Sequence, residues 1–148
     1  MKRRIALLIS GRGSNMEAIL LQARTGVLAH CCDPVVVVSS RPHAAGIAVA
    51  QALGVSTRVL SSKGVHRAQY DEDLISLLEP YRLDYLVLAG FMRILGPRVV
   101  ERYRDRIVNI HPADPAQFKG IGGYRWAWQS GLKATMVTVH LVDEGVDT

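Results

Sequence analysis

The sequence is poor in cysteine and has no long hydrophobic run. Its only two cysteines, Cys31 and Cys32, are adjacent. Without a C-x-x-C spacing or a disulfide framework, a reducing cytoplasm is the simplest compartment. No stretch approaches the roughly 18 to 20 continuous apolar residues of a membrane span, so we expect neither a membrane-spanning segment nor a membrane partner.

The first residues imitate a secretion signal. Basic residues precede an apolar run, but that run covers only Ile5 to Ile9 and ends in Ser and Gly without a small-residue cleavage site. We therefore expect residues 4–10 to form a first strand.

The remaining totals describe an ordinary globular domain. The 148 residues are enough for one hydrophobic core, and we expect a single domain over 1–148. The formal charge is +5, which favours anionic partners, either nucleic acids or small phosphates and carboxylates. Basic residues cluster at 97–106, yet Glu101 and Asp105 interrupt them, so we interpret this stretch as a solvated helix face and expect no nucleic-acid partner.

Apolar runs alternate with helical patterns along the chain. Continuous Val, Ile and Leu strands separated by helices predict an α/β fold, a doubly wound and mostly parallel sheet with helices on both faces. The expected strands are 4–10, 34–40, 56–60, 83–90, 106–111 and one near 138, and the expected helices are 14–26, 43–54, 66–81 and 97–104.

Three strand ends have unusual compositions, namely "SGRGSN" at 10–15, "AGFMRIL" at 89–95 and "NIHPADP" at 109–115. Ligands of such sheets bind at the carboxyl ends of the strands, so all three segments should meet at one edge. Asn109 and His111 should share one face of their strand, because side chains alternate. This coincidence favours an active site over a fraying strand end.

The first of these segments predicts an anion site. Gly11 and Gly13 allow backbone angles closed to other residues, and the N–H groups at the following helix start can cradle a phosphate. The loop matches neither the G-x-G-x-x-G fingerprint nor a Walker loop. Glycine turns without a ligand are common, so the main support for a phosphate site is the position of this loop directly after the first strand.

The second segment offers an apolar wall with one cation, Arg93. Such a surface suits a flat, largely apolar ligand that carries a carboxylate. Core packing with Arg93 at the surface is the competing interpretation and is slightly favoured. The stretch "HCCD" at 30–33 has the wrong spacing for structural zinc, so we expect no metal.

The stretch 138–148 supplies His140, Asp143, Glu144 and Asp147 after a strand. A carboxylate beside a His can fix its tautomer and favour the imidazolium. No Ser or Cys elbow provides a nucleophile. The substrate itself should therefore attack, while the protein supplies an oxyanion partner and proton transfer.

The segments "LLISGRGSNMEAIL", "LVLAGFMRILGP", "VNIHP" and "VTVHLVDEGVDT", in this order, resemble the glycinamide ribonucleotide formyltransferases of purine biosynthesis over essentially the whole chain. The Asn-x-His pair with a downstream Asp is shared with methionyl-tRNA formyltransferase and formyltetrahydrofolate deformylase. The G-x-G-S-N loop is more specific and is that family's phosphate-binding loop.

The resemblance implies formyl transfer from the co-substrate 10-formyltetrahydrofolate to the amine of glycinamide ribonucleotide. It implies the following roles: oxyanion stabilisation by Asn109 and His111, orientation of His111 and a water by Asp147, phosphate binding by Gly13, Ser14 and Asn15, and folate binding by Met92, Arg93, Ile94, Leu95, Asn109, Val142, Asp143 and Glu144. We expect a cytoplasmic monomer or homodimer.

Two features depart from the family pattern. Ala113, Asp114, Pro115 and Ala116 stand where the family usually has Ser-Leu-Leu-Pro, in a loop that borders the substrates. The family also continues with further strand and helix segments, whereas Thr148 follows directly after Asp147, so we expect the C-terminal segment of the domain to be lacking. Another formyl-folate enzyme and a non-catalytic binder of phosphate or folate are the alternatives.

Overall fold

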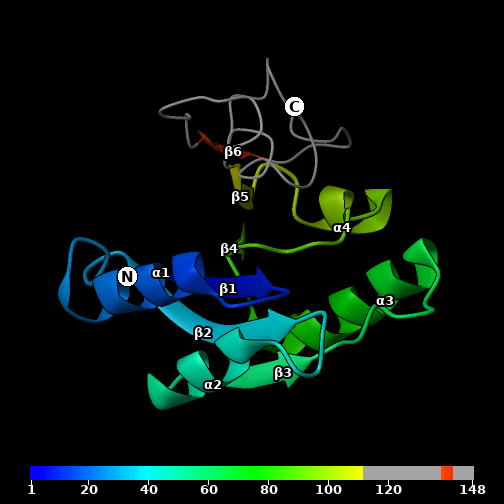
Figure 1. The fold of residues 1–148 in the computed structure, drawn as a ribbon. Coiled ribbons are helices and arrows are strands. Elements are labelled where there is room, and N and C mark those ends of the chain that lie inside the picture. Colours follow the sequence, from blue (N-terminus) through cyan, green and yellow to red (C-terminus); the bar gives the residue numbers. More distant parts are fainter. Residues whose placement is uncertain (112–137, 142–148) are drawn as a thin grey trace, which may run out of the picture.

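The computed structural model describes residues 1–111 and 138–141, and its centre is a six-stranded sheet of order β3-β2-β1-β4-β5-β6 (Figure 1). The first five strands in this order are parallel, and β6 runs antiparallel to β5. The strands are β1 (Arg3–Ile9), β2 (Cys32–Ser39), β3 (Thr57–Val59), β4 (Tyr85–Leu88), β5 (Ile107–His111) and β6 (Thr138–Leu141).

Helices cover both faces of the sheet. They are α1 (Ser14–Thr25), α2 (Ala45–Ala52), α3 (Arg67–Leu78), followed by a 3₁₀ turn η1 (Glu79–Tyr81), and α4 (Pro97–Arg102). Leu20 of α1 and Ala50 of α2 pack on one face, and Leu74 of α3 and Val99 of α4 pack on the other. A doubly wound, mostly parallel α/β fold is therefore confirmed.

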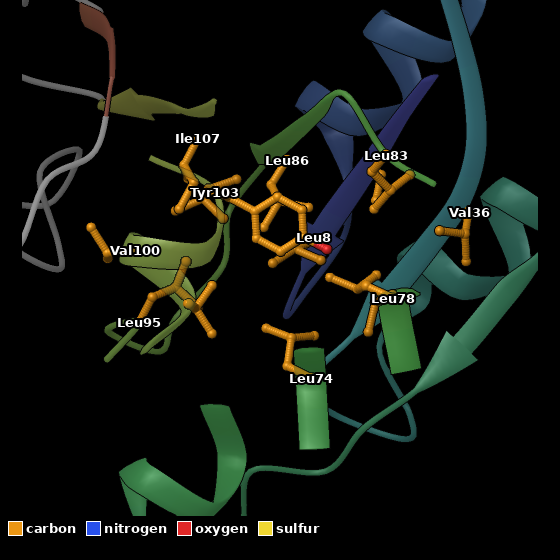
Figure 2. Packing of buried hydrophobic residues seen from close by; sticks show 14 of the residues in the cluster. Leu8, Val36, Leu74, Leu78, Leu83, Leu86, Leu95, Val100, Tyr103 and Ile107 are labelled. Carbon is orange, nitrogen blue, oxygen red and sulfur yellow. The ribbon is translucent and has the colours of Figure 1, made fainter. Parts of the chain in front are cut away.

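The alternating side chains of each strand divide the core into two clusters. On β1, Leu8 joins the α3–α4 cluster, and its neighbours Leu7 and Ile9 join the α1–α2 cluster. The same alternation runs along β4, where Leu86 and Leu88 face α3 and α4. Figure 2 shows this larger cluster, in which Tyr103 lies among the leucines.

The predicted segments match the observed elements, with shifts at their ends that have physical causes. Strand β2 begins two residues before the predicted 34–40, because Cys32 and Asp33 already pair with β1. Its register shifts beside Pro34, which has no N–H to offer the ladder. The helix expected over 66–81 is α-helical only to Leu78, since Pro80 ends it in the η1 turn.

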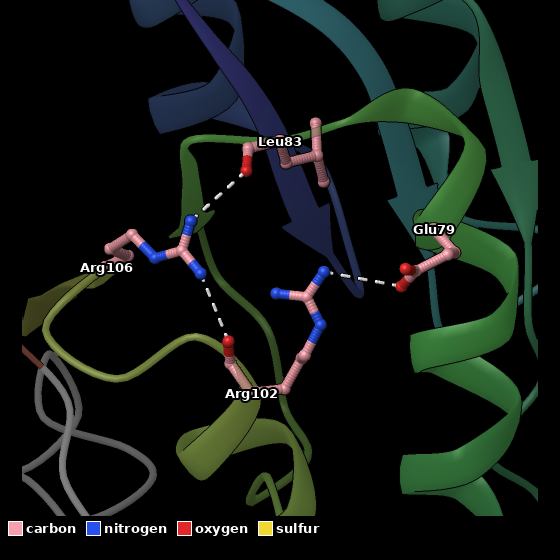
Figure 3. Close-up of polar contacts among 4 residues, drawn as sticks. All are labelled: Glu79, Leu83, Arg102 and Arg106. Carbon is pink, nitrogen blue, oxygen red and sulfur yellow. Dashed lines mark hydrogen bonds and ion pairs between the residues drawn. The ribbon is translucent and has the colours of Figure 1, made fainter.

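In the arginine-rich stretch 97–106, the charged side chains of α4 are exposed as expected, but the helix ends at Arg102, so Arg104 and Asp105 lie exposed beyond it. Arg102 forms an ion pair with Glu79 of η1 at 3.4 Å, and Arg106 donates hydrogen bonds to the carbonyls of Leu83 and Arg102 (Figure 3). Both guanidinium groups lie over the Tyr103 ring, 4.9 and 5.5 Å from its centroid. These contacts attach α4 to the end of α3.

In the described part of the chain, no helix is long and apolar enough to cross a membrane.

Candidate active site

The first two of the three unusual strand ends meet at the carboxyl edge of the sheet. The N–H of Ser10, after β1, donates to the carbonyl of Gly90, after β4, at 3.1 Å. The buried Ser10 Oγ accepts the Met92 N–H at 2.8 Å and lies 2.6 Å from the Ser40 Oγ, after β2. One hydroxyl thus joins the ends of three neighbouring strands.

The third strand end reaches the same level of the sheet. Asn109 of β5 lies opposite Leu88, the last residue of β4. Asn109 follows the buried Ile107 by two residues, so its side chain leaves the sheet on the α3–α4 face. It is half-buried and has interaction partners. The shared edge predicted from the sequence is confirmed as far as Asn109.

The glycine loop wraps the start of α1 on the opposite face. Gly13 caps α1 with φ of 74°, and its carbonyl accepts the Glu17 N–H at 2.7 Å. No side chain caps this helix start, so the first N–H groups, including those of Ser14 and Asn15, are directed out of the helix end. Ser14 is exposed and Asn15 half-buried. The arrangement fits a phosphate.

Gly46, in the first turn of α2, supports this loop and was missed from the sequence. Its N–H donates to the Gly11 carbonyl at 3.0 Å. A Cβ on Gly46 would lie 2.6 Å from the Ile9 Cδ1 and 3.0 Å from the Gly11 oxygen, so only glycine lets the two segments approach this closely. The only available signal was its place in the small-residue run of 43–54.

The loop after β4 presents apolar side chains at the edge. Gly90 turns the chain with φ of 77°. Met92 and Ile94 are 47% and 50% exposed, whereas Leu95 is 6% exposed and packs into the α3–α4 cluster. Of the four predicted apolar wall residues, Met92 and Ile94 can therefore meet a ligand with their side chains, whereas Phe91, like Leu95, packs against the α3–α4 cluster. Leu95 can offer only its backbone, and its carbonyl already accepts from Arg67 at 2.9 Å.

Arg93 is held by the protein. Its guanidinium donates to the carbonyls of Ser62 at 3.0 Å and Val65 at 2.8 Å, and lies 4.5 Å from the centroid of the Tyr70 ring. Burial raises the pKa of Tyr70 to about 12, against the opposing effect of the Arg93 charge, and its neutral hydroxyl donates to the Leu60 carbonyl at 2.8 Å. Arg93 thus joins the loop after β4 to the loop before α3.

Asp71 of α3, a second missed residue, fixes where α4 begins. Its buried carboxylate accepts the N–H of Gly96 at 2.9 Å and that of Val99 at 3.5 Å. This supplies the N-terminal cap that α4 lacks locally, and so anchors the end of the 90–96 loop. The sequence does carry a signal for it: Asp71 precedes Leu74 by three residues and Leu78 by seven. This helical spacing places an acidic residue on the buried face of α3.

Several predicted site residues lie outside the described part of the chain. They are Asp147 and the folate-binding candidates Val142, Asp143 and Glu144, together with the segment Ala113 to Ala116. The backbone of His111 pairs with Thr138 at the end of β5, and its side chain also lies outside the described set. Among the described residues, no group of three or more His, Cys, Asp or Glu side chains could hold a metal ion.

The fold and the edge geometry define a class of protein: a mostly parallel α/β domain with an uncapped helix start and exposed apolar side chains at the carboxyl edge of its sheet. The chain belongs to the formyl transferase family, whose profile matches residues 3–148.

Similar proteins support this membership. The chain is 35% identical to phosphoribosylglycinamide formyltransferase of Escherichia coli K12, with 97% of this chain and 67% of that protein covered. It is 39% identical to the trifunctional purine biosynthetic protein adenosine-3 of Drosophila melanogaster. That alignment includes 99% of this chain but spans only 11% of the length of the relative.

Solved structures agree. A glycinamide ribonucleotide transformylase from Geobacillus kaustophilus superposes with a TM-score of 0.91 at 36% identity, covering 100% of this chain and 78% of the other. A second, from Symbiobacterium toebii, gives a TM-score of 0.90 at 34% identity, covering 99% and 68%.

Proposed function

We propose that the protein transfers a formyl group from 10-formyltetrahydrofolate to the amine of glycinamide ribonucleotide. The names of its relatives support this reaction. Within the molecule, the observation that carries it is the pairing of an open helix start at Gly13 with an exposed apolar ledge at Met92 and Ile94 across one sheet edge.

The acceptor side suits a ribonucleotide phosphate. The N–H groups of Ser14 and Asn15 and the positive end of the α1 dipole favour an anion. Gly13 lets the loop pack closely against Met16 and Gly46, which fixes the helix start. This cradle favours the ribonucleotide over water as acceptor, which argues against a hydrolase. A phosphate held there leaves the amine end of the acceptor free to reach over the strand ends.

The donor side suits a flat ring system. Met92 and Ile94 offer apolar side chains, and the backbone of 92–95 offers polar groups to the ring edge. Arg93 acts mainly by holding this loop, because two carbonyls and the Tyr70 ring already engage its guanidinium. Leu95 contributes through its backbone, and Val142, Asp143 and Glu144 complete the folate site.

The chemistry belongs to Asn109, His111 and Asp147. When the amine attacks the formyl carbon, the Asn109 amide and a protonated His111 stabilise the oxyanion. Asp147 keeps His111 charged and, through a water, moves the proton from the attacking amine to the leaving nitrogen. The amine can attack, and the folate nitrogen can leave, only when both substrates lie over the same sheet edge, with one approaching from each face of the sheet.

The test measures formyl transfer to glycinamide ribonucleotide, with formate release to water followed in the same samples. We expect transfer to dominate, and His111→Ala to lower turnover about 100-fold or more, as for loss of an oxyanion donor. His30→Ala is the matched control, because His30 precedes β2 at the opposite end of the sheet. Dominant formate release would identify a hydrolase, and binding of both substrates without either product would identify a non-catalytic binder.

A further inference from the structure

The two cysteines form a paired thiol site at the amino-terminal end of β2. The Cys31 Sγ lies 3.8 Å from the Cys32 Sγ, and Cys31 is exposed. They are the only cysteines among these 148 residues, so every thiol reaction of this chain takes place here. The candidate active site lies at the other end of the same strand, beyond Ser39.

The turn before β2 fixes this pair. The N–H groups of Cys31 and Cys32 both donate to the Leu28 carbonyl, at 3.1 and 3.0 Å, and the Cys31 carbonyl accepts the Arg3 N–H at 2.8 Å. Cys32 then enters the sheet opposite Arg3 and packs against the α1–α2 cluster. These bonds fix the backbone of the turn, and the Cys31 Sγ also donates to the Leu28 carbonyl at 3.6 Å.

The separation of the sulfur atoms suits one bridging atom better than a direct bond. Neighbouring Cα atoms are about 3.8 Å apart across a trans peptide, shorter than the roughly 4.4 to 6.8 Å of ordinary disulfides. For an atom with bonds of about 2.3 Å to each sulfur, as in zinc thiolates, a sulfur separation of 3.8 Å gives an angle of about 110° at that atom. A pyramidal or tetrahedral centre accepts such an angle, and a linear one does not.

The number of thiol ligands at the site decides which thiol-binding element fits it. A structural zinc site needs four ligands, and the described residues offer no group of three. A trivalent arsenic that carries one organic substituent needs only two thiols. We propose that Cys31 and Cys32 together chelate a trivalent organic arsenical, R–As=O. In the product, arsenic is bonded to both sulfur atoms and to the organic group R, at a site remote from the candidate active site.

The reaction balances without an oxidant. Both S–H bonds break and two As–S bonds form, while the arsenic oxygen leaves with the two protons as water, and arsenic stays trivalent. Burial, reinforced by the hydrogen bond and charge of Cys31, raises the pKa of Cys32. Cys32 is therefore kept as a thiol, the form that this condensation consumes.

The test incubates the protein with phenylarsine oxide and weighs it intact by mass spectrometry. We expect one adduct per chain, with the mass of the reagent less one water, and protection of both thiols from N-ethylmaleimide. A dithiol such as 2,3-dimercaptopropanol should remove the adduct, whereas 2-mercaptoethanol at equal thiol concentration should not. The rate of formyl transfer should stay the same.

The control variant is Cys31→Ser, whose side chain is exposed, with its thermal unfolding compared with that of the original protein. We expect the stable adduct to disappear in a folded Cys31→Ser protein. An adduct that persists there, or a reagent that leaves both original thiols open to N-ethylmaleimide, would overturn the proposal. So would ready loss of two hydrogens with glutathione disulfide, because the pair would then close directly into a disulfide.

Discussion

Replacing Gly13 by Ala should destabilise the protein through a close contact as well as through backbone strain. Gly13 has φ of 74°, where a residue with a Cβ costs about 1 kcal/mol or somewhat more. The added Cβ would also lie 2.5 Å from the Met16 Cε and 3.1 Å from the Gly46 Cα. The end of Met16 can move, but this side chain is fully buried, and the Gly46 backbone cannot yield without moving α2.

Gly54 provides the matched control. Its φ is 76°, and a Cβ built there meets nothing within 4 Å. Gly54→Ala should therefore cost only the strain, about 1 kcal/mol. Gly13→Ala should add the roughly 1 to 3 kcal/mol of overpacking, for a total of about 2 to 4 kcal/mol.

Urea unfolding of both variants measures this difference as a shift in midpoint at constant slope. Gly13→Ala should also raise KM for the ribonucleotide more than KM for the folate, since the loop on the α1 face would move. If the two variants lose the same stability within about 0.5 kcal/mol, Met16 has absorbed the contact and the reasoning fails.

Three further predictions concern residues that support the site. Asp71→Ala removes the acceptor of two buried N–H groups at the start of α4 and should cost about 2 to 4 kcal/mol in urea unfolding; a loss below 1 kcal/mol would contradict this. Ser10→Ala leaves the Met92 N–H without its acceptor and should weaken folate binding more than ribonucleotide binding, as measured by the two KM values, while an equal change would count against it. The pKa of Tyr70 is about 12 in the folded protein and 10 in the unfolded chain, so the stability that its neutral hydroxyl contributes is complete below pH 10 and is lost as pH rises to 12. The difference in free energy of unfolding between the original protein and Tyr70→Phe should therefore fall by roughly 2 to 3 kcal/mol between pH 10 and pH 12. A difference that stays constant over this range would refute the prediction.

The strands could be predicted because they are buried on both faces. Strand interiors such as Val36 to Val38 read as continuous apolar runs, and the helices between them carry their own end signals. The shared edge followed from the parallel order alone. These features depend on short stretches of chain, which a single sequence displays directly.

The features of the site that could not be predicted from the sequence depend on contacts between distant residues. Asp71 is one carboxylate in a helical pattern until Gly96, 25 residues later, is placed against it. The engagement of Arg93 with the 60–65 loop, and the face on which Asn109 leaves the sheet, likewise require the packed fold. Residue types could therefore be identified as candidates, but their partners could not.

The central position of β1 sets the order in which the protein can assemble. The α1–α2 cluster takes nearly all its buried residues from the first 50 of the chain, with Ala89 as the late addition. The α3–α4 cluster is incomplete until Ile107 pairs with β4. During synthesis the first cluster can therefore gather early, with one side of β1 still unpaired until β4 emerges. We expect the amides of β1 and β2 to exchange with solvent more slowly than those of β5, which follows later in the chain and lies farther from the centre of the sheet.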